Sequence, residues 1–82
     1  MTTNAILDRI ACELISNSYV TELRIDRDAR TVTATAIEID TWSTTITVHD
    51  DESVTETSTD GTDTFANRHA SVDALVSFWK VG

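Results

Sequence analysis

Threonine alternates with other residue types in three consecutive stretches in the middle of the chain. These stretches contain Thr31, Thr33 and Thr35, then Thr45 and Thr47, then Thr55 and Thr57. Successive side chains of a strand point to opposite faces of a sheet, and β-branched residues favour strands. The period of two therefore predicts neighbouring strands whose threonines share one solvent-facing side of a sheet.

Apolar residues at both ends of the chain recur at helical spacing instead. A first helix is expected from Asn4 to Ser16, with Thr3 or Asn4 as its N-cap, because the apolar residues in this range repeat every three or four positions. A second helix is expected from Ser71, as its cap, to about Lys80.

Five alternating segments between the two helices predict antiparallel strands. The segments are Tyr19 to Asp26, Thr31 to Ile39, Trp42 to His49, Ser53 to Thr59 and Thr62 to Ala66. Asp60-Gly61 predicts a two-residue hairpin turn between the last two. The expected fold is a single small α+β domain over residues 1–82, with two layers: an N-terminal helix, an antiparallel meander of four to five strands, and a C-terminal helix packed on the sheet.

The charge of the chain excludes several classes of function. Fourteen acidic residues against six basic ones give a net charge of −8, which argues against direct binding of nucleic acid through a basic patch. Every apolar run is far shorter than the roughly 18 residues of a membrane span. The N-terminus shows no secretory signal, so a cytoplasmic location is expected.

The acidic composition has two interpretations. Nine aspartates, fifteen threonines and a single lysine resemble the composition of proteins from salt-in halophilic archaea, and predict a protein of such an archaeon or of one of its viruses or plasmids. Alternatively the negative surface is itself the function. The protein would then mimic nucleic acid and block a basic site on a partner protein, as anti-CRISPR, anti-restriction and immunity-type inhibitors do. The scarcity of lysine favours the first interpretation.

No motif in the chain indicates catalysis, a cofactor or a metal. The segment from His49 to Glu52 gathers an imidazole and three carboxylates, but consecutive side chains on a turn diverge, so a solvated turn is expected there. His69 is expected in a linker or cap before the second helix, and Cys12 on the polar side of the first. A regular threonine array can bind ice, but a small meander twists too much to match a flat lattice. We therefore expect a non-enzymatic protein with no catalytic residue, cofactor or metal.

Two apolar features remain without an assigned partner. Ile37 and Ile39 fall on the threonine side of the second strand unless a bulge reverses the alternation. On the second helix Ala74, Phe78 and Val81 widen the apolar arc to about 200°, more than packing on one sheet requires. Either small alanines let this helix sink deeply against the sheet, or the extra arc meets another chain.

We interpret these five residues, Ile37, Ile39, Ala74, Phe78 and Val81, as a predicted interface. The sequence thus predicts a small acidic interaction module that forms a homodimer, with an unidentified protein as a further candidate partner.

Overall fold

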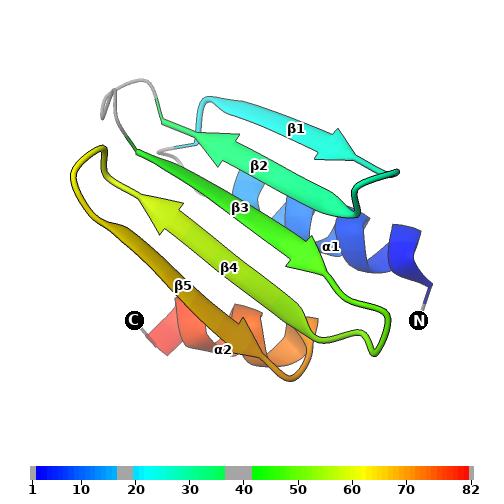
Figure 1. The fold of residues 1–82 in the computed structure, drawn as a ribbon. Helices are drawn as coiled ribbons and strands as arrows, with labels where there is room; N and C mark the ends of the chain where they lie inside the picture. The colour runs from blue at the N-terminus through cyan, green and yellow to red at the C-terminus, as the bar shows by residue number, and fades with distance from the viewer. Residues whose placement is uncertain (1, 17–19, 37–41, 82) are drawn as a thin grey trace.

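The computed structural model describes residues 2–16, 20–36 and 42–81 and confirms the α+β architecture. The elements in chain order are α1 (Thr3–Ile15), β1 (Glu22–Asp26), β2 (Thr31–Thr35), β3 (Ser43–Val48), β4 (Val54–Thr59), β5 (Thr64–His69) and α2 (Val72–Val81). Both helices lie on the same face of the sheet, α1 behind β1 to β3 and α2 behind β5 (Figure 1).

The sheet is a simple antiparallel meander. Its strand order is β1-β2-β3-β4-β5, so every strand pairs with its neighbour in the sequence. This order leaves β1 and β5 as the two edges of the sheet.

The face of the sheet that the helices cover holds the core. Small and β-branched residues of β2 and β3 alternate inward here as predicted, with Val32, Ala34 and Ile46 fully buried. The helices complete this core with buried apolar side chains that recur at helical spacing, namely Ile6, Leu7, Ile10, Ala11 and Leu14 of α1 and Val72, Leu75 and Val76 of α2.

The opposite face is the predicted threonine face. The register places Thr33 opposite Thr45 and Thr45 opposite Thr57, so that threonines of three strands form a row across the sheet. The Oγ1 atoms of Thr33 and Thr45 lie 3.3 Å apart, within hydrogen-bonding distance. The residues of this face could be predicted from the alternation along each strand, because successive side chains of a pleated strand point to opposite faces.

The helix and turn boundaries differ from the expected ones at two places. Thr2, not Thr3 or Asn4, is the N-cap of α1, and its Oγ1 accepts a 3.2 Å hydrogen bond from the backbone N–H of Ala5. The predicted two-residue turn is a longer loop over residues 60–63. Gly61 adopts a positive φ of 91° there, and the Asp60 carboxylate accepts bonds from the N–H groups of Thr62 and Asp63 at 2.9 and 2.8 Å.

The prediction for the last strand was wrong in both of its limits. β5 spans Thr64–His69 instead of Thr62 to Ala66, so His69 is a strand residue and not a linker or cap. Pairing in register with β4 extends the strand, because Arg68 lies opposite Thr55 and His69 opposite Val54. Polar residues in this segment have low strand propensity, and here tertiary pairing overrides that propensity.

Candidate interaction surface on α2 and β5

Helix α2 packs against the sheet with only part of its apolar arc. Leu75 is fully buried and Val72 and Val76 nearly so, while Ala74 is exposed and Phe78 is 52% exposed. The sequence left two alternatives open for the extra apolar arc of α2. In the structure the helix does not sink deeply enough against the sheet to bury this arc. The extra arc faces solvent.

The structure describes only part of the predicted interface. Ala74 and Phe78 lie one helical turn apart on α2 and share an exposed side of it. Ile37 and Ile39 lie outside the described residues. Val81 is the last residue of α2, and its side chain also lies outside the description.

Phe65 is a second exposed aromatic residue in this part of the chain, and the sequence analysis did not single it out. It lies on β5 opposite Ser58 and is 61% exposed. Alternation along β5 places Phe65, Asn67 and His69 on the helix-covered face of the sheet, but α2 lies behind only the later part of the strand (Figure 1). No local pattern in the sequence signals the exposure of Phe65, because it depends on how far α2 extends along β5.

Phe78 lies on the side of α2 that faces the edge of the sheet. Its ring packs on the imidazole of His69 in β5, with centroids 5.3 Å apart and planes tilted by 47°. We call the exposed apolar residues Phe65, Ala74 and Phe78 together the α2–β5 surface. This surface joins the outer side of a helix to the exposed edge strand beside it.

The charge on this part of the chain differs from the charge on the rest. Of the fourteen acidic residues only Asp73 lies between Thr64 and Val81, against Arg68 and Lys80 of the six basic residues. The segment therefore carries a formal charge of about +1 in a chain whose total is −8. The segment thus adds no net negative charge to the surface that it forms.

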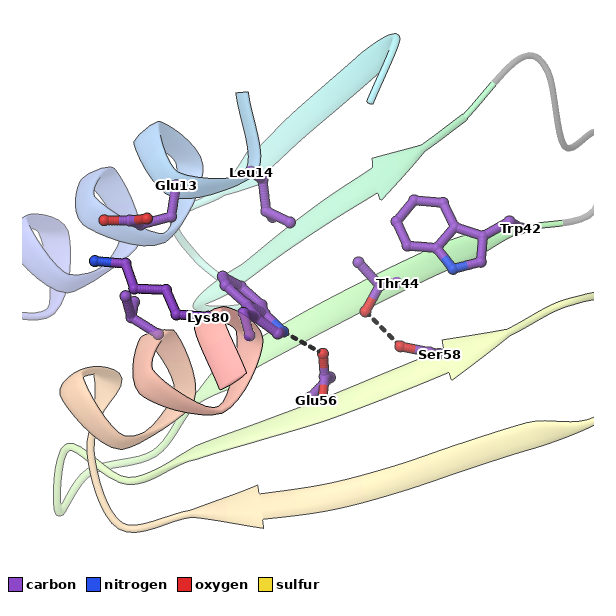
Figure 2. Close-up of a pocket in the computed structure, with 9 residues that line it drawn as sticks. Glu13, Leu14, Trp42, Thr44, Glu56, Ser58 and Lys80 are labelled. Carbon is purple, nitrogen blue, oxygen red and sulfur yellow. Dashed lines mark hydrogen bonds between the residues drawn. The ribbon is translucent and has the colours of Figure 1, made fainter. Parts of the chain in front are cut away.

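A cleft of about 350 Å³ opens between the two helices and the sheet. Both tryptophans of the chain line it, Trp42 from the position just before β3 and Trp79 from α2, although they are far apart in the sequence. Figure 2 shows Trp42 at one end, Glu13 and Lys80 toward the other, and Thr44 and Ser58 on the floor.

Two pairs of side chains in the cleft bind one another. The hydroxyls of Thr44 and Ser58 lie 2.8 Å apart, and the indole N–H of Trp79 donates a 2.7 Å bond to Glu56. The other oxygen of Glu56 lies 3.8 Å from Nε2 of His69, which is a buried nitrogen without a hydrogen-bond partner among the described residues.

The acidic turn after β3 disperses its side chains, as expected for a solvated turn. Asp50 bonds to Arg30, while Asp51 bonds to Ser53 and Arg68. The hydroxyl of Ser53, together with its backbone N–H, holds the pKa of Asp51 below its ordinary value. Within residues 2–16, 20–36 and 42–81, no group of three or more His, Cys, Asp or Glu side chains is placed to hold a metal ion.

Cys12 is exposed and unpaired, on the polar side of α1 as predicted. Neither helix of the described residues is long and apolar enough to cross a bilayer.

Comparison of the chain with family models, with curated proteins and with solved structures finds no match.

Proposed function

We propose that this protein is a small, non-enzymatic interaction module that forms a homodimer through its α2–β5 surface. The observation that carries the proposal is the 52% exposure of Phe78, which lies beside exposed Ala74 and packs on the edge strand. Aromatic residues are frequent anchors of protein interfaces, and burying a phenylalanine stabilises a complex by about 1.5 to 3 kcal/mol.

The acidic surface outside the α2–β5 surface fits a protein of a salt-rich cytoplasm. Salt near molar concentration shortens the screening length to about 3 Å, so that a charge of −8 no longer repels a second copy strongly. This is also why we propose a halophilic source, an archaeon or one of its viruses or plasmids, for the chain.

The alternative function, an acidic inhibitor that mimics nucleic acid, has weaker support. Four aspartates already bond to arginines, in the pairs Arg9–Asp73, Arg27–Asp8, Arg30–Asp50 and Arg68–Asp51. A mimic would instead present its carboxylates unpaired to a basic partner. The homodimer accounts for the exposed aromatic residues, which mimicry leaves unexplained.

Light scattering at molar potassium chloride tests the proposed homodimer. We expect the wild type to have twice the mass of the chain and Phe78→Asp to be a folded monomer, because a carboxylate buried at an interface costs several kcal/mol. Ser77→Asp is the matched control, since it adds the same charge to α2 at an exposed polar position and should leave the dimer intact.

Two results would contradict the proposal. A wild type that is monomeric at high salt would refute the homodimer. A dimer that survives Phe78→Asp would show that the α2–β5 surface is not where the copies meet.

A further inference from the structure

We propose that the exposed edge of β5 pairs with β5 of a second copy, antiparallel and centred on Ala66, to join two sheets into one. This inference rests on the proposed homodimer and adds to it the backbone contact that orients the two copies.

The backbone bonds at the ends of β4 define which groups of β5 point outward. Asp60 N–H donates to the carbonyl of Asp63 at 3.2 Å, and His49 N–H donates to the carbonyl of Ser53 at 2.8 Å. Bonded and non-bonded pairs alternate along an antiparallel ladder. Both bonds therefore predict that Phe65, Asn67 and His69 bond to β4, whereas the backbone groups of Thr64, Ala66 and Arg68 point away from the sheet.

The edge at β5 lacks the features that prevent strands from pairing with other molecules. Natural edge strands are protected by charged side chains, proline or bulges. β1 at the other edge carries Glu22, Arg24 and Asp26 in five residues. β5 carries Arg68 as its single formal charge in six residues, and five of those six residues are exposed. The β5 edge is thus the one that can accept another strand.

Pairing centred on Ala66 is self-complementary. Ala66 would bond to Ala66 of the second copy, and Thr64 to its Arg68, so that every outward N–H and C=O group of the strand finds a partner. On the helix-covered side, Phe65 would lie opposite Asn67 of the other copy. A register centred on Arg68 would instead bring two like charges together.

A second copy is the occupant that the charge of this segment favours. The segment from Thr64 to Val81 has one acidic residue against two basic ones, so two such segments meet almost without repulsion, whereas the rest of each chain is strongly acidic.

The extent of the contact also fits a dimer. A stable interface buries about 800 Å² on each partner, a modest share of the 5211 Å² that the chain exposes. A strand edge of about 20 Å supplies part of this area, and Phe65, Ala74 and Phe78 beside the edge would supply apolar surface for the rest.

Ala66→Pro tests the pairing, with Ala66→Val as its matched control. Proline removes an N–H that points away from β4, so the variant should fold with an unchanged circular dichroism spectrum and be monomeric by light scattering at high salt. Valine keeps the N–H and favours strands, so Ala66→Val should remain dimeric. An Ala66→Pro variant that stays dimeric, or that fails to fold because this N–H bonds to β4, would overturn the inference.

Amide hydrogen exchange by NMR separates the inference from the proposed function. In the wild-type dimer we expect the amides of Thr64, Ala66 and Arg68 to exchange at least about tenfold more slowly than in the Phe78→Asp monomer. The amides of Phe65 and Asn67 should be protected in both proteins. A dimer whose Ala66 amide exchanges as fast as in the monomer would overturn the strand pairing but leave the homodimer standing. A monomeric wild type would overturn both.

Discussion

Trp79 and Glu56 are joined by a 2.7 Å hydrogen bond from the indole Nε1 to the carboxylate Oε2, which ties α2 to β4. The side chain of Glu56 is only 12% exposed. A carboxylate so far from water is stable only with donors of its own, and the indole supplies one.

We expect Trp79→Phe to lower the free energy of unfolding by about 1.5 to 3 kcal/mol, the usual contribution of a hydrogen bond to a charged group. Trp79→Ala should cost about 3 kcal/mol or more, since it also removes a half-buried ring. Urea unfolding at high salt measures both. If Trp79→Phe were as stable as the wild type, the bond to Glu56 would contribute nothing to stability.

The thermal midpoint should rise steeply between dilute buffer and molar potassium chloride. Fourteen carboxylates on a chain of 82 residues repel one another until salt screens them. Thermal melts of the monomeric Phe78→Asp variant, followed by circular dichroism, separate this effect from dimer formation. A midpoint that does not change with salt would contradict the halophilic interpretation and favour the mimic.

Acid should destabilise the protein partly through the turn between β4 and β5. The backbone N–H groups of Asp63 and Thr62 hold the pKa of Asp60 below its ordinary value of 3.8. A carboxyl whose pKa is lowered by folding contributes stability above its unfolded pKa, and that contribution is lost as the pH falls through its folded pKa. Thermal midpoints measured downward from pH 5 should therefore fall less for Asp60→Asn than for the wild type.

Asp28→Asn is the control for this measurement, because it removes a carboxylate from a different turn of the sheet. Thermal midpoints should fall less with acid for Asp60→Asn than for Asp28→Asn. If Asp60→Asn and the wild type were equally sensitive to acid, the Asp60 turn would not contribute to the loss of stability at low pH.

Glu52→Gly should stabilise the protein by about 0.5 to 1 kcal/mol. Glu52 has a φ of 67°, in the left-handed region that is costly for residues with a Cβ and open to glycine. Glu52→Ala removes the same side chain without relieving the backbone, so the difference between the two variants in urea unfolding reports the backbone. An alanine variant as stable as the glycine variant would show that the positive φ costs nothing.

Much of the fold could be predicted from the sequence because it depends on local periodicity. The alternation of Thr33 and Thr45 with apolar neighbours determined the two faces of the sheet, and the order of segments determined the meander. The width of the apolar arc of α2 was also visible in the sequence, but it left two alternatives open, and only the structure shows that Ala74 and Phe78 are exposed.

The features that could not be predicted depend on the relative placement of distant elements. The exposure of Phe65 follows from how far α2 extends along β5. The cleft follows from the packing that brings Trp42 and Trp79 to its walls. The strand at His69 was missed because its stability comes from pairing with Val54, which no local pattern records.

The position of β1 at the far edge of the meander has a consequence for the size of the assembly. If two sheets join at β5, both outer ends of the combined sheet are β1 strands that carry Glu22, Arg24 and Asp26. An incoming third copy would find no uncharged edge to extend. The assembly would therefore stop at two copies. The first strand of each copy would itself prevent growth into fibres, and no other capping element would be needed.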